Sequence, residues 1–244
     1  MPEHNGEEIL SDIDKFWEWF TDEFDGFVQS KRSGIKLDKE KLLVSGESAG
    51  GFLAAYTWLT QPKERAAIKA LYLQYPMLCQ YSREPGPYRQ KIVNQPLCKE
   101  KIDKLIVQCT ELRDEGTMKS VSSRTPPDGM ACAYGLSSTK EWARVFHAQD
   151  IMQRLEEKTD QPATFPSVWI YHGMNDIQVP MSDTEKFMEV VQDKFQEMKG
   201  KFTFHAVPGM EHAGDCEKAD ERVDEYSWLK TMLTGLQHDW IGGN

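Results

Sequence analysis

The sequence predicts an α/β protein whose mainly parallel sheet is flanked by helices. Short apolar segments typical of strands alternate with amphipathic segments of helical spacing. The predicted strands cover residues 42–44, 68–76, 167–171 and 202–207. A helix between two strands of one sheet makes a right-handed crossover, which leaves those strands parallel. A chain of 244 residues fits one large α/β domain or two small ones, and we expect a single domain.

The turn after the first predicted strand holds the most specific motif of the chain. Residues 46–50 read Gly-Glu-Ser-Ala-Gly and separate the apolar run 42–44 from a helical stretch. A nucleophilic serine on such a turn projects above the sheet from a strained backbone with positive φ. Gly46 and Gly50, two residues to either side, leave room for strand and helix to pass closely. The motif therefore indicates that Ser48 is a nucleophile.

Two other interpretations of this turn exist. A glycine-rich turn between strand and helix can carry an incidental serine. A dinucleotide- or phosphate-binding loop is disfavoured, because the chain contains neither G-x-G-x-x-G nor Gly-Lys followed by Ser or Thr.

Composition and charge exclude several classes of protein. The net charge of −10 argues against a nucleic acid or an anionic membrane as partner. No apolar run approaches the length of a transmembrane helix, and the polar N-terminus carries no signal peptide. Five widely spaced cysteines without a C-x-x-C pair are typical of reduced thiols in an intracellular protein. We therefore expect a cytoplasmic protein with no metal site and no cofactor.

Residues 7–29 predict a long amphipathic helix, because apolar side chains recur at helical spacing and acidic residues fill the opposite face. We expect its apolar stripe to pack on a core rather than to form a binding surface. The stripe consists of Ile9, Ile13, Phe16, Trp17, Phe20, Phe24 and Phe27. Further helices are predicted over residues 52–59, 99–112, 183–199 and 219–233.

Residues 78–157 differ in character from the strands and helices around them. Proline- and glycine-rich turns separate short helical pieces there, and no strand pattern is present. A long insertion between two strands is commonly functional, so this segment is predicted to be a lid. Its aromatic side chains are expected to shape a pocket for the acyl or alcohol part of a substrate. They are Tyr81, Tyr88, Tyr134 and Trp142.

Three chemically reactive residue types follow predicted strands in the order Ser48, Asp176, His212. In a parallel α/β sheet, functional residues gather at the carboxyl ends of the strands. A serine hydroxyl is a weak nucleophile until an imidazole accepts its proton. A carboxylate on the other ring nitrogen fixes the imidazole tautomer and stabilises the imidazolium. This order and placement predict a catalytic triad with His212 as general base and Asp176 as orienting acid.

Other residues compete for these roles. Taken singly, an aspartate after a strand is usually a turn or cap residue, and a lone histidine is usually structural. His205 lies within a predicted strand and His147 within the lid. His172 precedes a glycine, where it is expected to shape the loop of residues 175–180 that carries Asp176, here called the acid loop. Asp215 is an alternative acid if its loop folds back on His212.

The motif at 46–51, the segment 171–180 (Tyr-His-Gly-Met-Asn-Asp-Ile-Gln-Val-Pro) and the segment 208–212 (Pro-Gly-Met-Glu-His) together resemble the α/β-hydrolase superfamily. The chain is most similar to its esterase/lipase group, the hormone-sensitive-lipase-like carboxylesterases. The resemblance implies that Ser48, Asp176 and His212 are the triad and that Ala49 supplies one oxyanion-hole N–H. Substrate contacts are assigned to four further residues: Glu47, Gly51, Tyr81 and Tyr134.

The chain departs from this group's pattern in its N-terminal part. The His-Gly-Gly-Gly type loop that supplies further oxyanion donors is absent, and 47 residues precede Ser48. The acid loop is also more similar to that of oligopeptidases and feruloyl esterases. We therefore expect an N-terminally truncated fold in which the strand at 42–44 becomes an apolar edge. Two hypotheses follow: a fragment of a longer hydrolase, or a homodimer that pairs at this edge.

The sequence thus predicts a serine hydrolase that cleaves small-molecule carboxylic esters through an acyl-enzyme. Loss of one oxyanion donor lowers turnover about 100- to 1,000-fold, so impaired activity is part of this expectation. A peptidase, thioesterase or acyltransferase with the same triad is the alternative within enzymes. A binding module on a degenerate hydrolase fold is the alternative outside them.

Overall fold

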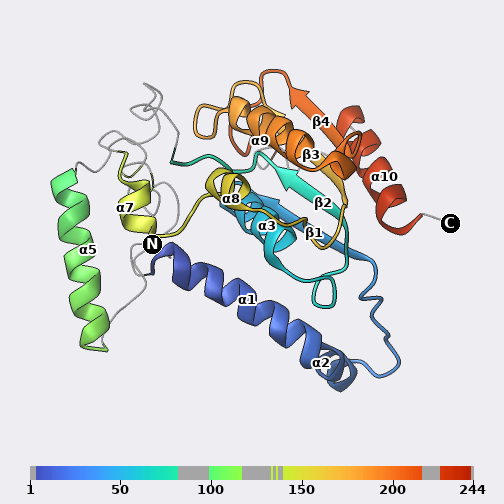
Figure 1. Ribbon diagram of the computed structural model, residues 1–244, viewed down its shortest axis with the longest axis horizontal. Helices are drawn as coiled ribbons and strands as arrows, with labels where there is room; N and C mark the ends of the chain where they lie inside the picture. The colour runs from blue at the N-terminus through green and yellow to red at the C-terminus, as the bar shows by residue number, and fades with distance from the viewer. Residues whose placement is uncertain are drawn as a thin grey trace. The chain divides into compact units, whose positions relative to one another are not determined.

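The computed structural model describes residues 4–81, 99–116, 133, 136, 140–215 and 226–242. Within them, a four-stranded sheet has the order β1-β2-β3-β4, and each neighbouring pair is parallel (Figure 1). The predicted parallel α/β architecture is therefore confirmed. The strands are β1 (Leu42–Glu47), β2 (Ile68–Gln74), β3 (Ser167–Gly173) and β4 (Phe202–Val207).

Helices precede, separate and follow these strands along the chain. None of those in the described ranges is both long and apolar enough to cross a membrane. Their bounds are α1 (Gly6–Asp22), α2 (Phe24–Lys31), α3 (Ala49–Thr60), α5 (Lys99–Asp114), α7 (Trp142–Phe146), α8 (Ile151–Glu157), α9 (Met181–Lys194), the 3₁₀ helix η2 (Gln196–Met198) and α10 (Ser227–Ile241).

The chain separates into two compact units. One, here called the sheet unit, comprises Ile13–Leu78 and Ile151–Asn244 and contains all four strands. The other, here called the insertion unit, comprises Met1–Asp12 and Cys79–Asp150. The lid at 78–157 and the single domain over the whole chain stay predictions.

Alternation along the strands gives the sheet unit two apolar faces. α10 contacts β2 and β3 on one face, through a core that includes Tyr72, Tyr171 and Leu236. Successive strand residues point to opposite faces. Leu71 and Ile170, both fully buried, therefore point to the other face, where α3 packs against β1 and β2 and α9 packs against β3. Burial on both faces explains the nearly continuous apolar runs of β2 and β3.

Several element ends differ from the predictions. The helix predicted over 7–29 divides at Glu23, whose φ of −123° leaves the helical region. The helix predicted to end at Lys199 ends at Lys194, and a short 3₁₀ turn follows it. The last helix runs to Ile241 rather than to about Leu233, and the residues 219–225 of its predicted start lie outside the described ones.

The apolar stripe of the first predicted helix is only partly a core face. Trp17 and Phe20 are buried, as expected, but Phe16 and Phe27 are 46% and 47% exposed. Their rings instead contact other aromatic rings of α1 and α2, such as Trp19. The wide aromatic stripe exceeds the strip of surface that a helix buries against one neighbour, so its flanking members face outwards.

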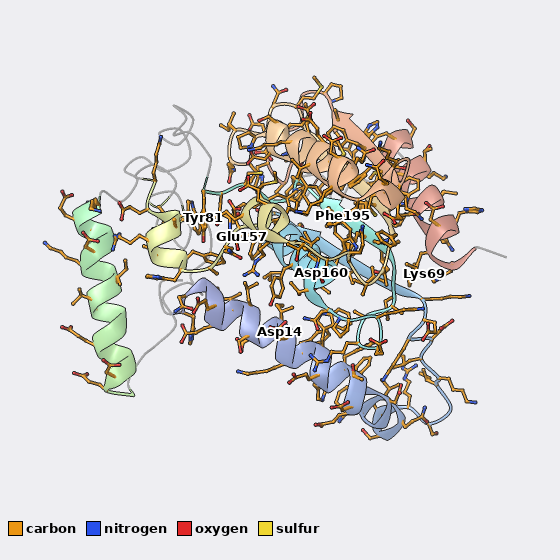
Figure 2. All side chains as sticks on the ribbon, in the orientation of Figure 1. Asp14, Lys69, Tyr81, Glu157, Asp160 and Phe195 are labelled. Atoms are coloured by element: carbon orange, nitrogen blue, oxygen red, sulfur yellow. The ribbon has the colours of Figure 1, made fainter. Side chains whose placement is uncertain are left out.

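A polar cluster fixes the sheet-unit part of α1 on α3. Figure 2 labels Asp14 on α1. Its carboxylate accepts hydrogen bonds from the Tyr56 hydroxyl and from the Gln61 amide. The Trp17 indole N–H donates to Thr57 Oγ1 at 3.2 Å. Hydrogen bonds of partly buried groups specify one orientation of a helix pair.

The insertion unit has its own internal contacts. Lys99 on α5 pairs with Glu141 at 2.8 Å, and Arg144 on α7 pairs with Asp103 at 2.6 Å. The Tyr81 hydroxyl donates to the Ala148 carbonyl. Two of the predicted pocket aromatics, Tyr88 and Tyr134, lie outside the described residues, whereas Trp142 is buried within α7.

Candidate active site

Ser48 stands between β1 and α3 in the strained conformation that its motif predicts. Its φ is 50° and its ψ is −116°, in the left-handed half of backbone space that non-glycine residues avoid. Backbone hydrogen bonds hold it there. Its N–H donates to Gln74 O at 2.9 Å, and its carbonyl accepts from Gly51 N at 3.0 Å and from Met77 N at 2.8 Å.

The glycines around Ser48 have unequal roles. A Cβ on Gly46 would lie 2.1 Å from the Gly50 carbonyl oxygen, so this position excludes any side chain. A Cβ on Gly51 would lie 2.4 Å from Pro76 Cβ. A Cβ on Gly50 would meet nothing within 4 Å, which corrects the expectation that both flanking glycines are required. The close approach of strand and helix is centred on Gly46 and Gly51.

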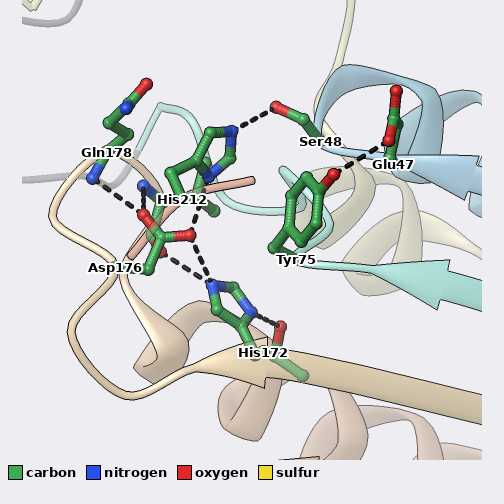
Figure 3. Close-up of polar contacts among 9 residues, drawn as sticks. Glu47, Ser48, Tyr75, His172, Asp176, Gln178 and His212 are labelled. Carbon is green, nitrogen blue, oxygen red and sulfur yellow. Dashed lines mark hydrogen bonds and ion pairs between the residues drawn. The ribbon is translucent and has the colours of Figure 1, made fainter. Parts of the chain in front are cut away.

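A chain of hydrogen bonds joins the three residues that the sequence singles out. His212 Nε2 lies 3.0 Å from Ser48 Oγ, and His212 Nδ1 lies 2.7 Å from Asp176 Oδ2 (Figure 3). The carboxylate accepts a hydrogen bond from Nδ1–H, which leaves the Nε2 lone pair of the neutral ring directed at the serine hydroxyl. All three residues belong to the sheet unit.

Asp176 is held as a carboxylate by four donors. Oδ1 accepts the backbone N–H groups of Gln178 at 2.9 Å and Val179 at 2.8 Å, while Oδ2 lies near ring nitrogens of His172 and His212. Burial alone raises the pKa of Asp176. The hydrogen bonds from His172 and His212 outweigh it, and the pKa lies well below its usual range.

The loops that carry Asp176 and His212 are joined to each other. Asn175 N donates to Met210 O at 3.0 Å, and Met174 N donates to Val207 O at 2.9 Å. A Cβ on Gly173 would lie 2.2 Å from the Met210 carbonyl oxygen. The glycine that follows His172 therefore lets the acid loop approach the histidine loop.

Tyr75 connects the serine turn with His212, although no feature of the sequence singles it out. Its hydroxyl donates to Glu47 Oε2 at 2.8 Å, one residue before Ser48 (Figure 3). Its ring meets the His212 ring nearly edge to face, with centroids 4.8 Å apart. The side chain is 1% exposed and the backbone has a φ of 37°. The strand β2 ends at Gln74, two residues before the proline that was expected to end it.

The competing residues have other partners in the structure. Asp215 Oδ2 lies 2.8 Å from the Tyr171 hydroxyl, so the loop does not bring this carboxylate to His212. His205, a residue of β4, stacks its ring on that of Trp228. His147 is the C-cap residue of α7 and has a left-handed backbone conformation. His172 contacts the acid loop, as expected.

Buried tyrosines surround Asp215. Burial, followed by the Asp215 carboxylate, raises the pKa of Tyr72 and of Tyr171 far above the usual value of a phenol. Both hydroxyls therefore stay protonated at any pH at which the protein is handled, and they can act only as neutral hydrogen-bonding groups.

The residues predicted to contact substrate or oxyanion are placed as follows. Glu47 is exposed at the end of β1 and bonded to Tyr75. Ala49 begins α3, and the first N–H groups of a helix have no acceptor inside it. Gly51 packs on Pro76, Tyr81 belongs to the insertion unit, and Tyr134 lies outside the described residues. In the described part of the chain, no group of three or more His, Cys, Asp and Glu side chains has the arrangement of a metal site.

Comparisons with known proteins agree with this architecture. A probable carboxylesterase, M8, of Phoma sp. is 25% identical over 199 residues, which cover 78% of this chain and 58% of that protein. A Staphylococcus aureus protein of unknown function has a similar structure, with a TM-score of 0.56, 17% identity and coverage of 96% of this chain and 74% of its own. The structure of the alpha/beta hydrolase GrgF of Penicillium sp. is also similar, with a TM-score of 0.52 and 12% sequence identity. The match covers 97% of this chain and 73% of GrgF.

The chain therefore spans 58% of the length of the carboxylesterase M8 that it matches. A family model described as the alpha/beta hydrolase fold matches residues 1–214. This match covers most of the sequence and includes the strands, the serine turn, Asp176 and His212. The chain belongs to the alpha/beta hydrolase fold family.

Proposed function

We propose that this protein hydrolyses carboxylic esters through an acyl-enzyme on Ser48, with His212 as general base and Asp176 as orienting acid. One observation carries the proposal: the unbroken hydrogen-bond chain from Ser48 Oγ through His212 to Asp176 Oδ2. The strained backbone at Ser48 and the similarity to a probable carboxylesterase support it.

In the first half of the reaction, neutral His212 takes the Ser48 hydroxyl proton while Oγ bonds to the ester carbonyl carbon. The tetrahedral intermediate carries an oxyanion. His212, now an imidazolium hydrogen-bonded to Asp176, gives the proton to the alcohol oxygen as the carbon–oxygen bond breaks. The alcohol leaves, and the acyl group remains on Ser48.

Water completes the cycle. His212 accepts a proton from water, whose oxygen attacks the acyl carbon, and the proton returns to Ser48 Oγ as the acid departs. Asp176 does not take up the proton, since its hydrogen bonds and low pKa favour the charged form. It stabilises the imidazolium in both halves of the reaction.

The oxyanion is proposed to bind at the N-terminus of α3. The Ala49 N–H follows the nucleophile directly, and the helix dipole places partial positive charge at this end. Glu47, Gly51, Tyr81 and Tyr134 are proposed substrate contacts. No metal ion or organic cofactor is needed for this chemistry.

Intact-mass labelling with a fluorophosphonate ester tests the proposal. The folded chain should gain the mass of one phosphonyl group, whereas Ser48→Ala and the heat-denatured chain should gain none. Absence of the adduct on a chain that is folded by circular dichroism would contradict an activated Ser48. The alternative of a binding module without enzymatic activity would then hold.

Turnover of a matched series of ester, thioester and anilide substrates separates esterase activity from the other activities that the same three residues could support. We expect hydrolysis of short p-nitrophenyl esters, with slower cleavage of the corresponding thioester and anilide. A faster thioester or anilide reaction would assign a thioesterase or peptidase function to the same three residues. Transfer of the acyl group to an added alcohol in preference to water would assign an acyltransferase.

A further inference from the structure

His172 lies behind Asp176 and is fully buried, yet the proposed mechanism does not use it. Its Nε2 lies 3.2 Å from Asp176 Oδ2 and 2.8 Å from the Val179 carbonyl oxygen. Its Nδ1 lies 2.9 Å from Thr184 Oγ1 on α9, and Thr184 is also fully buried. Both ring nitrogens are therefore engaged.

The partners of His172 determine where its proton sits. A carboxylate and a carbonyl oxygen are acceptors only, so Nε2 must carry a hydrogen and donate it between them. In a neutral ring, Nδ1 is then the acceptor, and the Thr184 hydroxyl must donate to it.

The other threonines on helices support this direction for Thr184. Four of them donate to the carbonyl four residues earlier: Thr21, Thr60, Thr231 and Thr234. In the described structure Thr184 makes no such bond, and its hydroxyl is directed at Nδ1 instead. The hydroxyl proton is thus available to the imidazole.

We infer that Thr184 and His172 form a buried extension of the proposed triad, in which Thr184 locks His172 as the Nε2–H tautomer and His172 positions Asp176 for His212. The inference rests on the proposed function of Asp176 and His212. His172 and Thr184 touch no reacting atom, so both are positioning residues.

This arrangement has a consequence for the general base. Asp176 Oδ2 is shared between His172 and His212, and the hydrogen bond from His172 is one cause of the lowered pKa of Asp176. A donor on Oδ2 draws negative charge away from the contact with His212. Removal of that donor leaves more negative charge on Oδ2 towards His212, which stabilises the imidazolium form of the general base relative to the neutral ring. The described ionisable groups in contact with Asp176 are these two histidines.

The elements explain why the extension is rigid. His172 is the penultimate residue of β3. Thr184 is in the first turn of α9, which packs on β3. The loop between them folds over Asp176 through the backbone N–H groups of Gln178 and Val179. Each atom of the extension is therefore held by regular secondary structure or by the acid loop.

Thr184→Val and Thr184→Ser form a matched pair for the test. Valine keeps the shape of the side chain and removes the donor, whereas serine keeps the donor. The loss of one hydrogen bond in the chain should slow fluorophosphonate labelling by about three- to tenfold in Thr184→Val. Thr184→Ser should react within about twofold of the wild type. The acid limb of the pH–rate profile should move to higher pH in Thr184→Val alone.

His172 variants provide the second arm. His172→Phe fills the space without a donor and should move the acid limb in the same direction as Thr184→Val. His172→Gln restores an N–H near the position of Nε2 and should return the profile towards that of the wild type. A labelling rate and pH profile unchanged in Thr184→Val and in folded His172→Phe would overturn the inference and leave a purely structural pair.

Nitrogen-15 NMR of the histidine rings gives an answer that does not depend on activity. At pH 7, His172 should give the spectrum of a neutral ring with its proton on Nε2, assigned by the loss of that signal in His172→Gln. A proton on Nδ1, or on both nitrogens, would overturn the inference. A wild-type chain that shows the Nε2–H tautomer without fluorophosphonate labelling would reject the proposed function and leave the tautomer assignment standing.

Discussion

Asp176 and Asp215 are both carboxylates near the ends of strands, yet they meet different hydrogen-bond donors. Asp176 accepts hydrogen bonds from two histidines and two backbone N–H groups, and its side chain is fully buried. Asp215 accepts from the Tyr171 hydroxyl. The choice of acid therefore depends on the donors that each carboxylate meets.

Substitution of each acid tests this assignment. Asp176→Asn keeps the size of the side chain, but its amide does not hold His212 in the required tautomer, so turnover and labelling should fall about 10⁴-fold. Asp215→Asn is the control and should react within about threefold of the wild type, the scale of one hydrogen bond. The measurement is the rate of fluorophosphonate labelling at pH 7. Equal losses of this rate in the two variants would contradict the assignment of Asp176.

Asp176 should also contribute to stability in a pH-dependent way. Its pKa is lower in the folded chain than the usual value of about 3.9 that applies when unfolded. Its contribution is therefore complete above that value and is lost as the pH falls through the folded pKa. The difference in free energy of unfolding between wild type and Asp176→Asn should shrink from pH 6 to pH 3 in urea titrations. A difference that stays constant over this range would contradict the lowered pKa.

At the scale of elements, the turn between β1 and α3 determines how Ser48 is presented. The strand and the helix meet where Gly46 faces the Gly50 carbonyl and where Gly51 faces Pro76. The N–H and carbonyl of Ser48 are bound to β2 and to the residues that follow it. The strained φ is thus maintained by backbone contacts on both sides of the turn.

Alanine at the two glycines of the motif should therefore have opposite effects. Gly46→Ala places a methyl group against a backbone oxygen and should lower the free energy of unfolding by about 1–3 kcal/mol. Gly50→Ala meets open space within a helix and should raise it by about 0.5–1 kcal/mol. Urea unfolding of both variants measures the contrast. A destabilised Gly50→Ala would show that the turn needs both glycines.

At the scale of the whole molecule, β1 lies at one edge of the sheet that the described residues form. Leu42 N donates to Ala67 O and Ser48 N donates to Gln74 O, so the even-numbered residues of the strand face β2. The N–H and carbonyl groups of Leu43, Ser45 and Glu47 therefore point away from it. An edge of this kind can pair with an identical strand of a second copy in an antiparallel, two-fold symmetric dimer.

The homodimer hypothesis has a direct test at this edge. Light scattering should give twice the chain mass for the wild type and for Ser45→Ala. Ser45→Pro removes an outward N–H without breaking the β1–β2 ladder and should give a monomer. A wild-type chain that is monomeric at all concentrations would reject the dimer.

The local units of this protein could be predicted from its amino-acid sequence. Strand patterns, the Gly-Glu-Ser-Ala-Gly turn and the order Ser48, Asp176, His212 follow from short-range periodicity and turn chemistry, and the structure brings these three side chains together. The helix ends were less well predicted, because tertiary packing sets where a helix stops. The helix predicted over residues 7–29 divides at Glu23, and the helix predicted to end at Lys199 ends at Lys194.

Which polar groups meet could not be predicted from the sequence. Tyr75 beneath His212, Thr184 on His172 and the pairing of Asp215 with Tyr171 link residues on different elements. Such contacts depend on strand register, on the helix that packs on each strand and on side-chain direction, and none of these leaves a repeating pattern in the sequence. Local chemistry therefore indicates the candidate residues, and packing sets the partners that each of them meets.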